Sequence, residues 1–246
     1  MRRRRFRYGL RIFLVIFLLA GVAAGAGWAL THLELFALKK IEVLGNPQTL
    51  KSTQIIQKTG VKTGSNLFAI DLDQIHKTLK KHDFFKEIYV HRRLPSTLVI
   101  EVKEFDPQFV LYTGRFYYID REGEIFKDIT DTADKRDFPV LTGIGEEEVL
   151  NLPHWVKKVL TRAGDLKEAY QNTEFAKAFG LSEIHYEKNI GFILYPEKKK
   201  YSIKFGRKDF GEKIEKLTQV MEKLSKKKAP ISSIDLNYPG KILMTL

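Results

Sequence analysis

Two runs of alternating apolar and polar residues lie between Phe84 and Pro107, one on each side of Pro95. This spacing predicts strands that bury one face. Proline fixes φ and lacks an amide donor, so Arg92–Ser96 is the predicted turn of a β-hairpin. The positions predicted to face inward are Ile88, Val90, Leu98, Ile100 and Val102, and those predicted to face solvent include Tyr89, His91, Val99 and Glu101.

A strand and two amphipathic helices are predicted ahead of this hairpin. They are a strand within Leu38–Asn46, a helix over Ser52–Lys58 with Ser52 or Thr53 as its cap, and a helix that follows a cap at Asp71 or Asp73 and ends near Lys81. Both helices have apolar residues three and four positions apart, so both can cover one side of a small sheet. The order strand, helix, helix, strand, strand makes a module of about 70 residues.

The rest of the chain predicts a second module, a mixed sheet with helices on one side. Its predicted strands are Phe109–Tyr112, Phe116–Asp120, Ile184–Glu187, Gly191–Tyr195, Tyr201–Phe205, Ile231–Asn237 and Lys241–Leu246. Residues 146–178 have a helical pattern that we expect to be broken around Pro153 and Gly164, and a further helix is expected over Lys213–Leu224.

Short motifs in this order resemble the FtsQ/DivIB family of bacterial cell-division proteins, whose first exported domain is a POTRA domain. The motifs are a glycine after the first strand, G-x-N-L-F-x-I-D at Gly64–Asp71, R-R-x-P-x-T-L-x-I at Arg92–Ile100, F-Y-Y-I-D-x-x-G-x-I-F at Phe116–Phe126, F-P-V-L-T-G at Phe138–Gly143, F-G at Phe205–Gly206 and I-D-L-N-Y at Ile234–Tyr238. The resemblance implies an α+β protein with a β-α-α-β-β POTRA domain at residues 36–104 and an FtsQ-type β domain at residues 105–246.

An apolar run near the amino terminus predicts a membrane anchor. Residues 12–33 contain no acidic or basic residue apart from His32, and about 22 residues make roughly 33 Å of helix, enough to cross a bilayer. A cleaved signal peptide is the alternative, although its apolar core is usually shorter. The preceding tail, residues 1–11, carries Arg2, Arg3, Arg4, Arg5, Arg7 and Arg11. Basic residues beside a span stay in the cytoplasm, so a single-pass type II protein of the inner (plasma) membrane is predicted.

Charge and cysteine content narrow the class of protein further. The net charge is +12, and half of it comes from the six arginines of the tail. The lysine runs at residues 198–200 and 226–228 would suggest nucleic acid in a cytosolic protein, but outside a membrane we interpret them as solvated faces or contacts to anionic envelope polymers. With no cysteine in the chain, disulfides and thiolate chemistry are excluded.

The sequence offers no catalytic, metal-binding or cofactor-binding constellation. It lacks G-x-S-x-G, H-E-x-x-H and G-K-[ST] motifs, and its six histidines have no metal-ligand spacing. Acidic pairs such as Asp71 with Asp73, and the run Glu146–Glu148, are interpreted as helix caps and first-turn acids. We therefore predict a protein that is not an enzyme and has no small-molecule substrate.

The resemblance also implies a partner-binding site near the end of the chain, where an FtsB-like protein adds a strand to a sheet edge. It assigns the contact to Tyr238 and the preceding turn to Gly240, and the predicted edge strand Lys241–Leu246 has Ile242 and Met244 on one face. FtsB- and FtsL-like division proteins and membrane lipid are the implied partners. The predicted function is a divisome scaffold in septum formation. A POTRA-type polypeptide transport or outer-membrane assembly factor is the alternative, and a cell-wall hydrolase would need a catalytic site.

Overall fold

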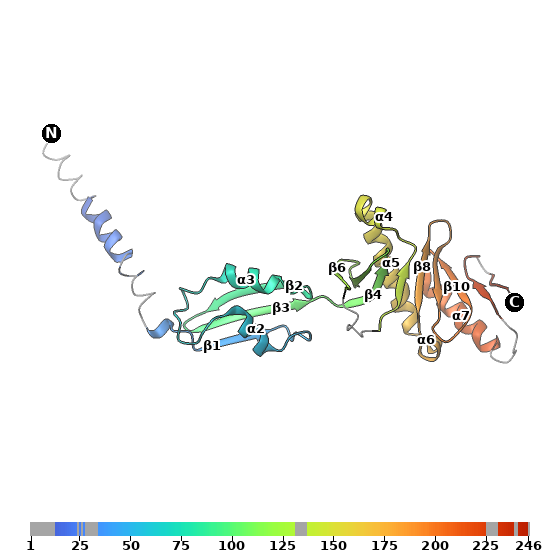
Figure 1. Cartoon of the computed structure of the whole chain (residues 1–246), viewed down its shortest axis with the longest axis horizontal. Helices are drawn as coiled ribbons and strands as arrows, with labels where there is room; N and C mark the ends of the chain where they lie inside the picture. Colours follow the sequence, from blue (N-terminus) through green and yellow to red (C-terminus); the bar gives the residue numbers. More distant parts are fainter. Residues whose placement is uncertain are drawn as a thin grey trace, which may run out of the picture. The chain divides into compact units, whose positions relative to one another are not determined.

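The structure is a computed structural model that describes residues 13–23, 25, 27, 34–130, 137–224, 231–238 and 241–245. The chain divides into two compact units, with the boundary between Glu104 and Phe105 (Figure 1).

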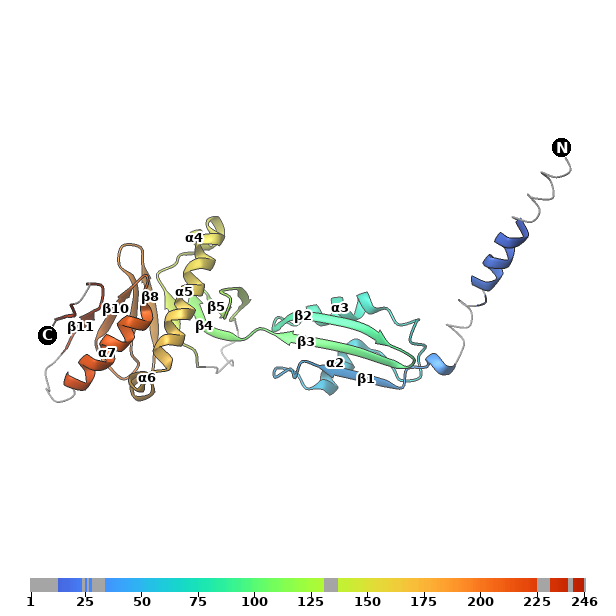
Figure 2. The same ribbon diagram turned by 180° about the vertical axis from the view of Figure 1, so that it is seen from behind.

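The first unit contains a three-stranded sheet and two helices in the predicted order. Its elements are the 3-10 helix η1 (Glu34–Phe36), β1 (Lys40–Leu44), α2 (Ser52–Thr59), α3 (Leu72–Lys80), β2 (Phe85–Arg93) and β3 (Thr97–Glu104). The strand order is β1-β3-β2, with β1 parallel and β2 antiparallel to β3. Both helices lie on one face of the sheet, which is seen from its two sides in Figures 1 and 2.

One of the two predicted helix caps is confirmed and the other is wrong. The carboxylate of Asp71 accepts a hydrogen bond from the Gln74 amide at 2.9 Å and caps α3. Helix α2 is preceded by Lys51, not capped by Ser52 or Thr53, and the Gln54 side chain accepts from the Lys51 amide at 2.8 Å. The side chain of Gln54, in the first turn, thus accepts from the residue before the helix, whereas a Ser or Thr cap would accept from an amide of the first turn.

The core of the first unit lies between the sheet and the two helices, as the alternation predicts. Ile100, on the central strand, has no exposed surface and packs with side chains from both helices, including Ile55, Ile75 and Leu79. Val99 was predicted to face solvent, and that prediction is wrong, because it too has no exposed surface. It lies on the helix-free face of the central strand, with Glu42 of β1 and His91 of β2 as its register partners.

The hairpin turn is shorter than predicted, because β2 continues through Arg93. Arg92 therefore stands on the helix side of the sheet, where its Nε donates to the Leu67 carbonyl at 2.8 Å and its guanidinium also donates to the Ile70 carbonyl at 2.6 Å. Arg93 points to the opposite face and forms an ion pair with Glu42 at 2.5 Å. Two adjacent arginines thus make very different contacts.

The second unit is built on a nine-stranded mixed sheet of the described residues, in the order β12-β11-β10-β9-β8-β7-β4-β5-β6. The pairs β4–β7, β7–β8 and β10–β11 are parallel and the others are antiparallel. The strands are β4 (Pro107–Tyr112), β5 (Phe116–Asp120), β6 (Ile125–Asp128), β7 (Val140–Thr142), β8 (Glu183–Glu187), β9 (Gly191–Tyr195), β10 (Ser202–Gly206), β11 (Ser233–Asp235) and β12 (Leu243–Thr245).

Helices cover one face of this sheet, as predicted (Figure 2). They are α4 (Glu146–Asn151), α5 (Pro153–Gln171), α6 (Glu174–Phe179) and α7 (Phe210–Leu224). The predicted break at Pro153 is present, but the one at Gly164 is absent, because α5 runs through it with Ala163 and Leu166 fully buried on either side. Burial of an apolar stripe outweighs the roughly 1 kcal/mol cost of a glycine inside a helix.

Two buried tyrosines in this core differ in their hydrogen bonds. The Tyr170 hydroxyl donates to the Gly180 carbonyl at 3.0 Å. The Tyr201 hydroxyl is buried without a hydrogen-bond partner in the described part of the chain, and burial raises its pKa to about 12.

We expect the substitutions Tyr201→Phe and Tyr170→Phe to change stability in opposite directions. Tyr201→Phe removes an unsatisfied hydroxyl and should stabilise the second unit by about 1 kcal/mol, whereas Tyr170→Phe orphans a carbonyl and should cost about 1 to 2 kcal/mol. Trp155 is the only tryptophan in residues 34–246, so urea unfolding of that fragment followed by tryptophan fluorescence reports on this unit. A destabilised Tyr201→Phe variant would mean that the hydroxyl has a partner.

Candidate partner-binding site

Strand β12 forms one edge of the large sheet, and β6 forms the other. On its inner side β12 is antiparallel to β11, with Ile234 opposite Met244 and Asp235 opposite Leu243. No strand of the described residues pairs with its outer side. The backbone groups on an open edge can hydrogen-bond to an incoming extended segment.

The residues predicted for this site fall into different environments. Tyr238 is 51% exposed beside the edge, and Met244 is exposed on β12 itself. Ile242 precedes β12, which is shorter than the predicted Lys241–Leu246, and packs against the hydrophobic core instead of sharing an exposed face with Met244. Gly240 lies outside the described residues. The exposed apolar side chain that the prediction missed is Leu243.

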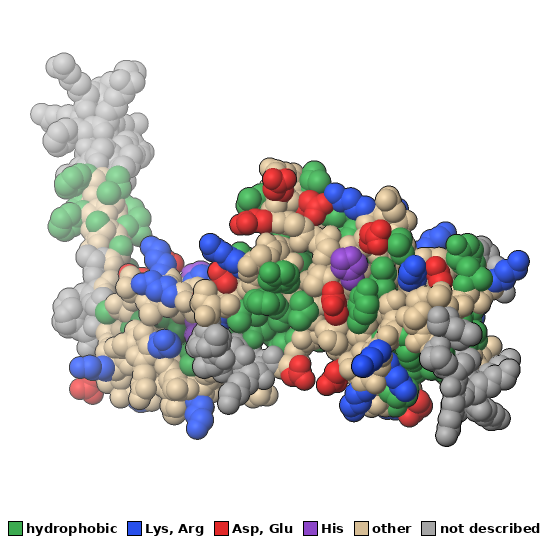
Figure 3. Space-filling view, turned by 45° about the vertical axis from the view of Figure 1, so that its right-hand side comes forward, with side chains coloured by type: hydrophobic (Ala, Val, Ile, Leu, Met, Phe, Trp, Pro, Cys, Tyr) green, Lys and Arg blue, Asp and Glu red, His purple; other side chains and the backbone are tan. Residues whose placement is uncertain are grey.

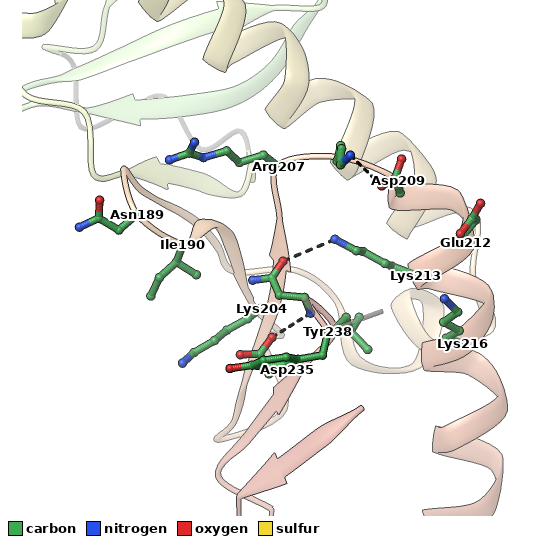
Figure 4. Close-up of a pocket in the computed structure, with 13 residues that line it drawn as sticks. Asn189, Ile190, Lys204, Arg207, Asp209, Glu212, Lys213, Lys216, Asp235 and Tyr238 are labelled. Atoms are coloured by element: carbon green, nitrogen blue, oxygen red, sulfur yellow. Dashed lines mark hydrogen bonds and ion pairs between the residues drawn. The ribbon is translucent and has the colours of Figure 1, made fainter. Parts of the chain in front are cut away.

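A charged pocket of about 950 Å³ lies next to Tyr238 (Figure 4). It is formed by β10, β11, the first turns of α7 and the turn between β8 and β9, and its charged residues are Lys204, Arg207, Lys208, Asp209, Glu212, Lys213, Lys216 and Asp235. A pocket with both signs of charge and an open mouth suits the polar flank of a peptide.

Lys213 ties α7 to the strands at the base of this pocket. Its ammonium donates to the Phe205 carbonyl at 2.6 Å and lies 3.5 Å from the Asn237 amide oxygen. Burial lowers the pKa of Lys213, and the carboxylates of Asp209 and Asp235 partly oppose that shift. The ammonium thus has a structural role and is less free than the other lysines to contact a partner.

The F-G motif at Phe205–Gly206 explains how the segment before β12 is positioned. Gly206 has a φ of +70°, and a Cβ atom there would lie 1.9 Å from the Asn237 side-chain oxygen. Only glycine fits this close approach. The backbone N–H of Asn237 in turn donates to the Asp235 carboxylate at 2.9 Å, which fixes the chain immediately before Tyr238.

The described residues contain no group of three or more histidine, aspartate or glutamate side chains placed to hold a metal ion. Thr142 hydrogen-bonds to both Glu183 and the His185 Nδ1, at 2.5 and 2.7 Å, so this histidine is a satisfied polar residue of the sheet surface.

Much of the predicted anchor lies outside the described residues. These include residues 1–12, and with them Arg2, Arg3, Arg4, Arg5, Arg7 and Arg11, as well as residues 24, 26 and 28–33. Residues 13–23 are helical, and within the described part of the chain no helix has the length and apolarity needed to cross a membrane.

Comparison with known proteins identifies both units. Residues 36–105 match the family described as the POTRA domain, FtsQ-type, and residues 110–237 match the family described as cell division protein FtsQ/DivIB, C-terminal. The chain belongs to the FtsQ/DivIB family. Proteins of this family are non-enzymatic scaffolds of bacterial cell division. The matches also identify the β-α-α-β-β unit as a POTRA domain.

Whole-chain relatives agree with this assignment. The cell division protein FtsQ of Geotalea daltonii is 32% identical over 85% of this chain and 75% of its own length. FtsQ of Geobacter sp. (strain M21) is 34% identical over 92% of this chain and 83% of its own length. Among solved structures, the major extracytoplasmic domain of DivIB from Geobacillus stearothermophilus has 17% identity and a TM-score of 0.32, covering 52% of this chain and 99% of that domain.

Proposed function

We propose that this FtsQ/DivIB-family protein is a membrane-anchored scaffold that recruits other division proteins through the β12 edge of its second unit. The observation that carries the proposal is an open edge strand beside the exposed Tyr238 and a charged pocket. Both family matches are of the FtsQ type, which favours cell division over the alternative of polypeptide transport or outer-membrane assembly.

The proposed arrangement places residues 1–11 in the cytoplasm, residues 12–33 across the inner membrane, and the POTRA and FtsQ-type β domains, residues 36–104 and 105–246, outside it. The apolar run and the six preceding arginines support this orientation. A division scaffold with this topology is expected at the septum.

In the proposed mechanism, an extended segment of an FtsB- or FtsL-like protein pairs with the backbone of β12. Main-chain hydrogen bonds supply affinity, and side-chain contacts supply specificity. Leu243 and Met244 offer exposed apolar contacts along the strand, and Tyr238 offers an aromatic surface with a polar tip. The charged pocket would receive the flank of the same segment.

A pair of substitutions at Met244 separates the contribution of the backbone from that of the side chain. In this register the backbone N–H of Met244 points away from β11, so Met244→Pro removes a donor from the open side of the edge strand, whereas Met244→Ala keeps the donor and removes only an exposed side chain. We expect the proline variant to bind a purified FtsB-like protein of the same host at least about 10-fold more weakly, and the alanine variant to bind within about threefold of the unmodified protein.

The aromatic contact is tested by Tyr238→Ala against Tyr112→Ala, a tyrosine of similar exposure on β4, near the other end of the sheet. Only Tyr238→Ala should weaken capture. Deleting residues 241–246 should abolish it while leaving the chain membrane-bound. Capture at full strength by a deletion variant that is still folded by circular dichroism would refute the proposal.

A further inference from the structure

A second surface on the β domain, distinct from the β12 edge, has an apolar floor and a basic rim. A groove of about 230 Å³ lies between α5 and the strands β8 and β9, with Trp155, Val159, Tyr186 and Phe192 among its lining residues. The Trp155 and Tyr186 rings meet edge to face at 5.7 Å, and Tyr186 meets Phe192 at 5.2 Å. The floor is therefore a packed aromatic surface that an apolar side chain can contact.

The rim of this groove carries cations that are not neutralised within the described part of the chain. Lys158, Arg162 and Arg207 line it, and none of them has a carboxylate within 4.0 Å among the described residues. Arg162 instead donates to the backbone carbonyl of Arg207 at 2.6 Å, which holds the Arg162 guanidinium beside the backbone of Arg207. An apolar residue flanked by carboxylates is the chemistry that complements such a groove.

The chain itself presents that chemistry at α4, one turn before the groove. Leu150 is 72% exposed and Leu152 is 50% exposed, and Glu146 and Glu147 are exposed beside them without an ion-pair partner among the described residues. Figure 3 shows acidic and hydrophobic side chains together at the upper tip of this unit, where α4 lies. We call Glu146, Glu147, Leu150 and Leu152 the acidic corner.

Contacts on the inner side of α4 hold the acidic corner outward. Val149 packs against the core, and Glu148 both accepts from the Gly145 amide at 2.7 Å and forms an ion pair with Lys188. Lys188 lies 5.7 Å from the Trp155 ring, between α4 and the groove. Glu146, Glu147 and Leu150 are thus on a supported helix, Leu152 follows it directly, and all four side chains are exposed.

We propose that the β domain self-associates, with the acidic corner of one copy seated in the basic groove of a second copy. Corner and groove are adjacent on every copy, because α4 leads directly into α5, so a two-fold axis lets the two copies exchange these contacts reciprocally. Such an arrangement closes at a dimer and does not propagate into a filament. The interface is small, and the association is expected to be weak and reversible.

A charge-swap experiment tests this arrangement in the full chain. Two versions with different affinity tags are co-expressed in membranes, solubilised in mild detergent, and co-captured. Glu146→Lys with Glu147→Lys makes the corner repel the groove, and Lys158→Glu with Arg162→Glu makes the groove repel the corner. All four side chains are exposed, and the hydrogen bond that Arg162→Glu removes is exposed as well, so the fold should be unaffected, which circular dichroism checks.

We expect each double variant to lose co-capture with itself by at least about fivefold, since like charges then oppose at both contacts. When the two double variants are mixed, both contacts regain opposite charges, and co-capture should return to within about twofold of the unmodified chain. No co-capture of the unmodified chain, co-capture unaffected by the charge reversals, or failure of the mixture to recover would each overturn the proposal. Without co-capture, or without recovery in the mixture, the groove would serve an acidic segment of another protein. Co-capture that the charge reversals leave unaffected would place the association in the apolar amino-terminal run.

Discussion

Replacing Ile100 by alanine is expected to destabilise the POTRA domain by about 2 to 5 kcal/mol. Ile100 occupies the central strand, its side chain is fully buried, and its register partners are Val43 on β1 and Val90 on β2. Neighbours on a central strand are fixed by hydrogen bonds on both sides, so they cannot move in to fill the space that alanine leaves. The cost therefore includes both lost apolar burial and a cavity.

Glu101→Ala is the matched control for this substitution. Glu101 is the next residue of β3, is exposed, and points to the helix-free face, so its removal should change stability by no more than about 0.5 kcal/mol. Both variants can be measured by urea unfolding of residues 36–104, which we expect to fold independently. A loss below about 0.5 kcal/mol for Ile100→Ala would mean that the register of β3 is shifted by one residue.

The POTRA domain could be predicted because each of its elements is long enough to show a period. Ile88, Leu98, Ile100 and Val102 alternate over strands of eight and nine residues, and the helices repeat their apolar positions over two turns. The burial of Val99 could not be predicted, because Val99 is flanked on both sides by strands whose residues, Glu42 and His91, come from other parts of the chain. An alternating pattern predicts the face of the sheet on which a residue lies, but not how far neighbouring strands bury it.

The second unit was harder to predict because several of its strands are very short. β7, β11 and β12 have three residues each, too few for an alternation to repeat. Strand β7 lies between β4 and β8 in parallel, and β11 lies parallel to β10, so their positions depend on partners far along the chain. The family motifs at Phe138–Gly143 and Ile234–Tyr238 overlap β7 and β11, but the pairing of these two strands is seen only in the structure.

The candidate binding site likewise combines a residue predicted from the sequence with residues that only the fold brings together. Tyr238 is predicted as a partner contact only through the family resemblance, and its side chain is exposed in the structure. The pocket beside it joins Lys204, Lys213 and Asp235, which come from three different elements, and no local pattern brings them together. Leu243 and Met244 are consecutive on β12 and lie on opposite faces, yet both are exposed, which an alternation over three residues does not predict.

Replacing Arg92 by alanine is expected to cost the POTRA domain about 2 to 4 kcal/mol. The Arg92 guanidinium donates to the carbonyls of Leu67 and Ile70, in the segment that leads into α3. Alanine would leave both carbonyls without their donor next to the buried side chains of those residues. Arg92→Lys should lose most of the same free energy, since a single ammonium cannot reproduce the geometry of a planar guanidinium with several donors.

Arg93 supplies the control, since it differs from Arg92 only in the face of β2 on which it lies. Its ion pair with Glu42 is exposed, and such pairs contribute at most about 1 kcal/mol. Arg93→Ala should therefore leave the urea midpoint of residues 36–104 almost unchanged, while Arg92→Ala lowers it clearly. Equal effects of the two substitutions would mean that the R-R motif stabilises the domain through its total charge and not through the carbonyl contacts of one arginine.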